Sequence, residues 1–272
     1  MGDATDTPSG TPPNAELVTV DRRDGGVVVV TLHNPPLNAL SAALLTRLAE
    51  VGEELAADAS VKAVVVTGSG ERAFAAGADI SEFGGPDEAR TVARTFRRAC
   101  AALESIPRPV VAAVEGFALG GGLEVALACD VRVVSQNSRL GQPEILLGII
   151  PGGGGTQRLT RLVGPAHAKE LIWSGRQVGP EEALVLGLAD RMVDAGQALD
   201  GALEWANELA SGAVVAMGLA KRAIHAGLGE PLDRGLDAEE EAFAEVFRTE
   251  DAATGIASFK EHGPGKATFS GR

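Results

Sequence analysis

The sequence of 272 residues has few cysteines, no cluster of positive charge and no long apolar run. Its two cysteines, Cys100 and Cys129, lack the paired spacing of a zinc site and the density of a disulfide scaffold, which favours buried, unreactive thiols. Lys and Arg total 24 against 37 Asp and Glu, for a formal net charge of -13, and no basic run exceeds two residues. A nucleic-acid partner is therefore not expected, because phosphate binding depends on clustered positive charge.

Membrane and export segments are not evident either. A bilayer span needs about 18 to 20 consecutive apolar residues, and no stretch of the sequence reaches that length. The first six residues are acidic and have neither the basic nor the apolar region of a secretory signal. We expect a cytoplasmic protein without a membrane partner.

Several common catalytic motifs are also missing. The sequence contains no Gly-x-x-x-x-Gly-Lys-Ser/Thr phosphate loop and no Gly-x-Ser-x-Gly elbow, which argues against nucleoside triphosphate binding and serine hydrolysis. The four histidines are widely spread and do not have the spacing of metal ligands: His33, His167, His225 and His262. We expect no metal site.

The first part of the chain alternates between turn-forming and apolar segments. Residues 1–14 are rich in Thr, Pro, Gly and Asp, which predicts a disordered tail. Residues 18–20 and 27–32 are β-branched runs joined by Asp-Gly-Gly, the signature of a hairpin. Residues 38–55 have apolar side chains at helical spacing, with Ser41 near the start as a cap.

The middle of the chain repeats a pattern of strand, glycine-rich turn and helix. Strands are predicted at 61–67, 109–114, 131–135 and 139–140, and helices at 123–129 and 156–162. The longer strands are mostly apolar and lack the regular alternation of a solvent-facing sheet, as in sheets that are buried on both faces. After Pro165 the pattern is helical, at 166–174, 180–186, 199–211, 214–226 and 232–247. These elements predict an α/β core of parallel layers followed by a C-terminal helical region.

Two glutamates stand beside glycine clusters in apolar surroundings. Glu124 closes Gly120-Gly121-Gly122-Leu123-Glu124, and Glu144 lies in 141–148, shortly before the glycines of 152–155. Burying a charge costs several kcal/mol unless it is paired or used, so the two glutamates indicate an acid–base site. The alternative interpretation is structural: the glycines allow strand and helix to pack, Glu124 faces solvent, and Glu144 begins a helix.

The glycine cluster also predicts a site for a developing negative charge. A helix that begins at Gly121 leaves its first N–H groups unpaired, and the small-residue loop 74–79 offers a second donor. Two backbone donors on one carbonyl oxygen would stabilise an enolate by about 3 to 4 kcal/mol each. On a thioester, the two glutamates would then handle water and the proton on the α-carbon.

Three segments together resemble the crotonase superfamily, the enoyl-coenzyme A (CoA) hydratase/isomerase family. They are residues 73–80, 109–124 and 141–159, and the resemblance extends from about Leu17 to Phe269. It implies a crotonase-like spiral of ββα units over 15–200 and a C-terminal helical region, 201–272, that forms homotrimers or homohexamers. It also implies that the amides of Ala78 and Gly121 form the oxyanion hole.

The resemblance further implies a reaction and a substrate. Glu124 and Glu144 would hold the water that adds across the 2,3-double bond of a 2-enoyl-CoA thioester, giving 3-hydroxyacyl-CoA, and Glu144 would donate the α-proton. No cofactor is implied, since coenzyme A is part of the substrate. The CoA contacts carried over are Asn38, Ala39, Leu40, Ala76, Asp79, Ile80 and Ser81, together with Lys260.

The sequence departs from the family at the CoA phosphates. Pro35-Pro36 stands where many relatives have a basic residue, and the segment after Ser258 lacks the usual adjacent Lys-Arg. Lys260, His262 or Lys266 are the substitutes, each of which is equally compatible with a surface role. The alternatives for function are an enoyl-CoA isomerase, another crotonase-type reaction on acyl-CoA, or a non-catalytic acyl-CoA binder. Because both glutamates are present, the hydratase is the leading hypothesis.

Overall fold

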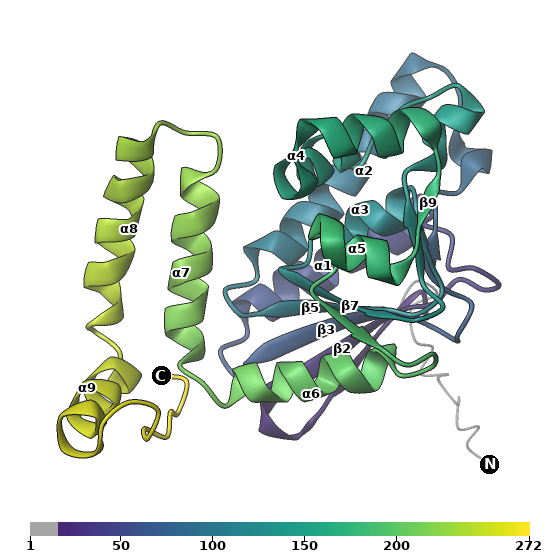
Figure 1. The fold of residues 1–272 in the computed structure, drawn as a ribbon. Coiled ribbons are helices and arrows are strands. Elements are labelled where there is room, and N and C mark those ends of the chain that lie inside the picture. The colour runs from purple at the N-terminus through teal and green to yellow at the C-terminus, as the bar shows by residue number, and fades with distance from the viewer. Residues whose placement is uncertain (1–15) are drawn as a thin grey trace, which may run out of the picture.

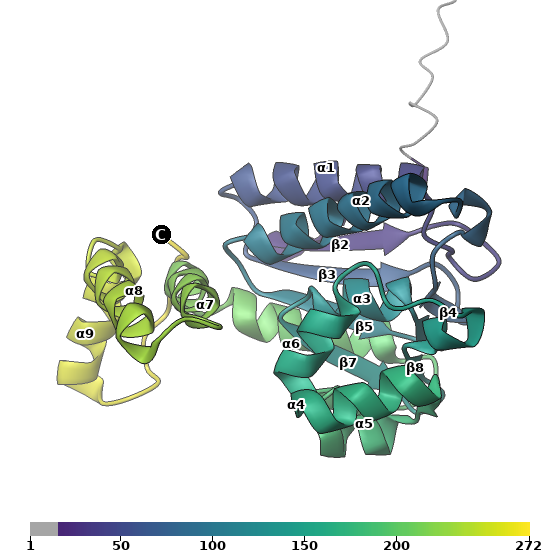
Figure 2. The ribbon, with the colours of Figure 1, turned by 90° about the horizontal axis from the view of Figure 1, so that it is seen from above.

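The computed structural model describes residues 16–272, so the predicted tail at 1–14 lies outside the described residues. Two β-sheets and the helices packed on them form the core (Figures 1 and 2). The larger sheet has the strand order β1-β2-β3-β5-β7-β10 and the smaller sheet the order β4-β6-β8-β9. The strands of the larger sheet are Val18–Arg22 (β1), Val27–Leu32 (β2), Ala63–Gly68 (β3), Val110–Val114 (β5), Val131–Ser135 (β7) and Arg191–Val193 (β10). Those of the smaller sheet are Ala73–Ala76 (β4), Phe117–Leu119 (β6), Arg139–Gly141 (β8) and Gln177–Val178 (β9).

The larger sheet explains the apolar strands of the sequence. Strands β1 and β2 form the predicted antiparallel hairpin through the turn Asp24–Gly26, and β2, β3, β5, β7 and β10 run parallel. Alternate residues of the central strands face opposite sides. Val64 and Val66 face the main core, whereas Ala63 and Val65 face a second core. Both faces are therefore covered, which removes the alternation of a solvent-exposed sheet.

The chain winds as a spiral of ββα units, as predicted. In three successive units the first strand joins the larger sheet, the second joins the smaller sheet, and a helix follows: β3-β4-α2, β5-β6-α3 and β7-β8-α4. These helices are Pro86–Ser105 (α2), Gly121–Leu127 (α3) and Gly155–Ser174 (α4). Helix α4 breaks at Gly164, before Pro165, where the sequence predicts two separate helices.

One helical prediction needs correction. Helix α1, Ala42–Ala57, begins after Ser41, whose hydroxyl accepts the amide of Leu44 at 3.2 Å; the predicted start at residue 38 is wrong. The reason is that Asn38 has φ 54°, in the left-handed region, and Leu40 forms a parallel bridge with Ala78. Two further helices, α2 and Glu250–His262 (α9), lie in segments for which the sequence pattern gives no assignment.

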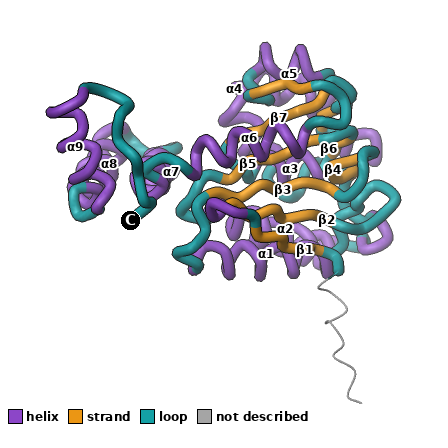
Figure 3. The backbone as a smooth tube through the Cα atoms, turned by 90° about the horizontal axis from the view of Figure 1, so that it is seen from below, coloured by secondary structure: helices purple, strands orange, loops and turns teal. Residues whose placement is uncertain are grey.

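The C-terminal helices separate into one that belongs to the core and an arm. Pro180–Leu186 (α5) follows β9, and Ala198–Ala210 (α6) packs under the larger sheet, where Ala202 and Ala206 are fully buried. The arm consists of Val214–Gly227 (α7), Leu232–Val246 (α8) and α9, and it stands apart from both sheets (Figures 1 and 3). Within residues 16–272, no helix is both long and apolar enough to cross a membrane.

Candidate active site

Three loops that follow neighbouring strands of the smaller sheet carry the predicted site. Strands β4, β6 and β8 are parallel, so their carboxyl ends meet at one edge of the sheet. Ala78 follows β4, Gly121 follows β6, and Glu144 follows β8 at the start of the 3-10 helix Pro143–Leu147 (η3). Each ββα unit therefore contributes one of these residues to the same place.

The two predicted oxyanion donors are neighbours with unused amides. A Cβ built on Gly121 would lie 3.5 Å from the amide nitrogen of Ala78. Leu40 and Ala78 form a parallel β-bridge, but both hydrogen bonds of this bridge go to the neighbours of Ala78. The Leu40 amide donates to the Gly77 carbonyl, and the Asp79 amide donates to the Leu40 carbonyl. The amide of Ala78 therefore points away from Leu40. Gly121 is the first residue of α3, where an N–H has no intrahelical acceptor. The two N–H groups can converge on one oxygen atom.

Glu124 is buried and is held by backbone amides. It lies in the first turn of α3 and is 2% exposed. Its Oε1 accepts hydrogen bonds from the amide of Gly153 at 2.8 Å and from that of Gly155 at 2.7 Å. Burial raises the pKa of Glu124, while these bonds and the positive charge of Arg158 oppose the rise because they favour the carboxylate. The alternative that Glu124 faces solvent is excluded.

Glu144 lies on η3 and approaches the start of α3, the helix that carries Glu124. Its Oε1 would lie 3.0 Å from a Cβ on Gly120, the residue that precedes α3 and has φ 54°, so Gly120 leaves room for this carboxyl group. Burial raises the pKa of Glu144 to about 7; a bond from its own amide opposes this, and the charge of Glu124 adds to it. Glu144 thus changes its protonation state near neutral pH.

The side chain of Gln142 is in contact with Glu144. Gln142 is fully buried and lies immediately before η3. With its amide nitrogen turned toward the carboxyl group, Gln142 donates to Oε1 of Glu144 at 2.9 Å and to Oε2 at 3.2 Å. That orientation is assigned from the hydrogen-bond network, because nitrogen and oxygen of an amide are not distinguished by shape. Gln142 therefore fixes the direction in which the carboxyl group points.

The structure brings most of the predicted CoA contacts to this edge. The segments 38–40 and 76–80 lie side by side through the bridge of Leu40 with Ala78 and the bond from the Ala76 amide to the Leu37 carbonyl. Ala39 and Asp79 are partly buried there, Ile80 is 62% exposed, and Ser81 is in the 3-10 helix Ile80–Glu82 (η2).

Two of the predicted CoA contacts have other surroundings. The buried side chain of Asn38 donates to the carbonyls of Ser69 and Ala73 and accepts from the Asn34 amide, so it stabilises the loops rather than facing the site. Lys260 is exposed on α9 in the arm, which a single chain does not bring to the glutamates (Figure 1).

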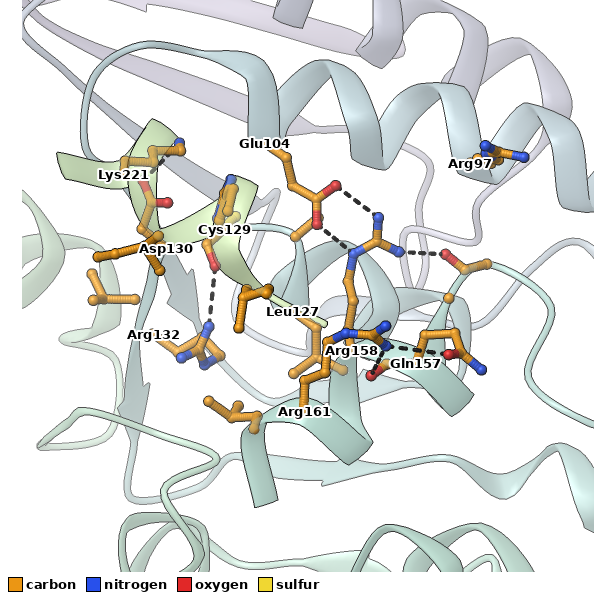
Figure 4. Close-up of a pocket in the computed structure, with 18 of the residues that line it drawn as sticks. Arg97, Glu104, Leu127, Cys129, Asp130, Arg132, Gln157, Arg158, Arg161 and Lys221 are labelled. Atoms are coloured by element: carbon orange, nitrogen blue, oxygen red, sulfur yellow. Dashed lines mark hydrogen bonds and ion pairs between the residues drawn. The ribbon is translucent and has the colours of Figure 1, made fainter. Parts of the chain in front are cut away.

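Sequence reasoning missed the loop that holds Glu124. The sequence places the glycines of 152–155 beside Glu144 and gives no indication that their amides bind Glu124. The signal for free amides was present, since a glycine run before a helix exposes backbone amides. Next to this loop, a cavity of about 1320 Å³ lies between the core and α7 and is lined in part by Gly153, Gly154 and Arg158 (Figure 4).

The fold and the site define an α/β protein equipped for acid–base chemistry on a carbonyl compound. A sequence model of the enoyl-CoA hydratase/isomerase family matches residues 22–272. The chain belongs to this family, the crotonase superfamily, as the sequence motifs predict.

Relatives of known name are similar over nearly the whole chain. The short-chain-enoyl-CoA hydratase of Clostridium acetobutylicum is 45% identical over 249 residues, covering 88% of this chain and 93% of the relative. The crotonyl-CoA hydratase of Syntrophomonas wolfei is 37% identical over 248 residues, covering 90% and 95%. The crystal structure of enoyl-CoA hydratase from Bacillus anthracis superposes with a TM-score of 0.88 at 38% identity, covering 94% of this chain and all of the other.

Proposed function

We propose that this protein hydrates short 2-enoyl-CoA thioesters to 3-hydroxyacyl-CoA. The observation that carries the proposal is the meeting of Glu124 and Glu144 beside the paired amides of Ala78 and Gly121. The names of the relatives from Clostridium acetobutylicum and Syntrophomonas wolfei support a short acyl chain.

The amides would bind the thioester oxygen. As the nucleophile adds to C3, negative charge moves to this oxygen, and two donors there would stabilise the enolate by about 3 to 4 kcal/mol each. These hydrogen bonds become stronger as negative charge develops on the oxygen, so they stabilise the transition state more than the bound substrate.

The two carboxyl groups would divide the proton transfers. Glu124 accepts a proton from the water as its oxygen bonds to C3, and Glu144 gives its own proton to C2. One proton then passes from Glu124 to Glu144 and restores the pair. The negative charge of Glu124 favours the protonated form of Glu144, so an ionised Glu124 beside a protonated Glu144 is the favoured arrangement of charge. General acid–base help of this kind contributes about 10² to 10⁴-fold in rate.

Crotonyl-CoA is the substrate for the test. Addition of the purified protein removes the absorbance of the conjugated enoyl thioester, and Glu144→Gln abolishes the change while leaving the thermal unfolding transition in place. An active Glu144→Gln variant contradicts the assigned role. A protein that only moves the double bond of a 3-enoyl-CoA, without hydrating crotonyl-CoA, is an isomerase, and one that binds acyl-CoA without turnover of either compound is a binder.

The CoA moiety would lie along the segments 38–40 and 76–81, with the acyl group directed to the glutamates. The backbone of these segments supplies the contacts, since the Asn38 side chain is already bonded. Lys260 would reach CoA only from another subunit, because it lies on the arm. Loss of CoA affinity in Lys260→Ala, with kcat unchanged, tests that contact.

We propose further that the region 201–272 assembles the protein into homotrimers or homohexamers. The arm exposes large apolar side chains that a lone chain leaves in water, including Leu232 (77% exposed), Phe243 (64%) and Phe259 (62%). Light scattering coupled to size exclusion gives the number of copies, and a monomer contradicts the proposal. A cytoplasmic location stays a prediction, for which cell fractionation is the measurement.

A further inference from the structure

One arginine outside the reacting groups contacts the loop that holds Glu124. Arg158 is on α4, and its Nη1 donates to the carbonyl oxygen of Gly153 at 3.0 Å. The amide of the same Gly153 donates to Glu124 at 2.8 Å. A Cβ on Gly154 would lie 1.9 Å from Nη1, so the guanidinium lies directly against the loop backbone. A movement of Arg158 would therefore displace Gly153, one of the two residues whose amides donate to Glu124.

A second carboxylate fixes the arginine. Glu104 on α2 accepts from Nε of Arg158 at 2.6 Å and from Nη2 at 2.9 Å, the two-pronged geometry that holds a guanidinium most firmly (Figure 4). The side chain of Arg158 is 20% exposed and that of Glu104 is 33% exposed, so solvent screens this ion pair less than a pair on the open surface. Glu104, Arg158 and the loop thus link α2 to α4 behind Glu124.

The charge of Arg158 acts in the same direction as its geometry. It lowers the pKa of Glu124, against the rise that burial causes. The other titratable groups around Glu124 are Cys100 on α2, whose thiol pKa burial raises to about 12, and Glu144 on η3. Among the described residues, Arg158 is the cation whose charge lowers the pKa of Glu124.

We propose that Arg158, anchored by Glu104, is a positioning residue that sets both the place and the ionisation of Glu124. The inference rests on the proposed hydration, in which Glu124 accepts a proton from water. Arg158 does not touch the reacting atoms. It acts through the Gly153 carbonyl and through its charge, and neither the family match nor the names of the relatives assign it a role.

The test compares wild type with Arg158→Gln on crotonyl-CoA. The variant is expected to lose about 10- to 100-fold in kcat, since a displacement of about 1 Å can cost roughly 10²-fold, with KM nearly unchanged. The acidic limb of the pH–kcat profile moves to higher pH, because Glu124 must be ionised and has lost a nearby positive charge. Arg158→Lys keeps the positive charge but cannot make the two-pronged contact with Glu104. We therefore expect the acidic limb of its pH–kcat profile to stay in place and its kcat to fall less than that of Arg158→Gln.

Two further variants control the experiment. Arg161→Gln removes an arginine that lies in the same cavity one turn along α4 and that, within residues 16–272, bonds only to Gln157, so it keeps the wild-type kcat and profile. Glu104→Gln releases Arg158 from its anchor and gives a smaller loss than Arg158→Gln. Thermal unfolding identifies any variant that does not fold; should Arg158→Gln unfold, Arg158→Lys and Glu104→Gln carry the comparison.

The results separate the two proposals. A wild-type protein that leaves crotonyl-CoA unchanged overturns the proposed function itself. An active wild type with a folded Arg158→Gln variant of equal kcat and unmoved limb overturns the positioning role alone. Equal losses in Arg158→Gln and Arg161→Gln also overturn it, because the effect then belongs to the cavity and not to the contact with Gly153.

Discussion

Replacing Gly153 by alanine is the sharpest steric test of the site. A Cβ at this position would lie 2.5 Å from Oε2 of Glu124 and 2.7 Å from Cδ1 of Phe96, a buried ring on α2. Ordinary contacts of this kind are about 3.5 to 4.0 Å long, so the carboxylate or the ring must shift by about 1 Å. A misplacement of that size costs roughly 10²-fold in rate.

The neighbouring residue provides the control. A Cβ on Gly152 would have no atom within 4 Å, and neither Gly152 nor Gly153 has a positive φ, so both backbones accept alanine. Gly152→Ala is expected to keep the wild-type kcat. Gly153→Ala is expected to lose about 100-fold in kcat and about 1 to 3 kcal/mol in stability, the usual cost of overpacking.

The assay follows the loss of enoyl absorbance with crotonyl-CoA, and chemical denaturation gives the free energy of unfolding. The ratio of the two alanine variants removes effects that any added methyl group has on this loop. Equal kcat values for Gly153→Ala and wild type, in folded protein, would refute the conclusion that Glu124 must be held in this position for the reaction.

The remaining predictions concern pH, packing, capping and metal. Hydration falls as pH rises through about 7, because Glu144 must be protonated to donate. Over pH 4.5 to 7, wild type also loses stability relative to Glu144→Gln, since the pKa of Glu144 in the folded protein, about 7, lies above its ordinary value of 4.5. A flat profile across neutral pH contradicts this. Gly122→Ala would place a Cβ 1.9 Å from the Ala75 carbonyl oxygen and is expected to prevent accumulation of folded protein, as circular dichroism would show. Ser41→Ala removes the cap of α1 and costs about 1 kcal/mol in urea unfolding, where no change would argue against the cap. Dialysis against a chelator leaves the hydration rate unchanged, and a loss restored by a divalent cation would show a metal requirement.

Much of the fold follows from the chain because the larger sheet is made of long apolar strands. Strands β2, β3, β5 and β7 are recognisable as runs of mostly apolar, β-branched residues, since burial on both faces leaves few polar positions. The smaller sheet is harder to predict. Strand β6, Phe117–Leu119, has three residues between glycines, and only its pairing with β4 and β8 makes it a strand.

Helix α2 shows why an amphipathic helix can be difficult to recognise from the spacing of apolar residues. Its buried stripe is narrow, with Phe96, Cys100 and Leu103 spaced over two turns, and most of its other side chains are polar or small. Tertiary packing against α1 and α3 supplies the stability that composition alone does not indicate.

The site was predictable only in part, for a related reason. Carboxylates beside glycines stand out in a sequence, so Glu124 and Glu144 were found. The groups that hold Glu124 are amides of Gly153 and Gly155, about 30 residues later. Every residue except proline has a backbone N–H donor, so the sequence does not mark the particular amides that bind a carboxylate. Which loop meets which carboxylate depends on the winding of the chain.

The three loops at the edge of the smaller sheet divide the site among three repeats of the spiral. Each spiral repeat delivers a different component: Ala78 from one, Gly121 from the next and Glu144 from the third. A substitution at position 144 would therefore alter the third loop alone and leave in place the amides of Ala78 and Gly121, which the first two repeats supply.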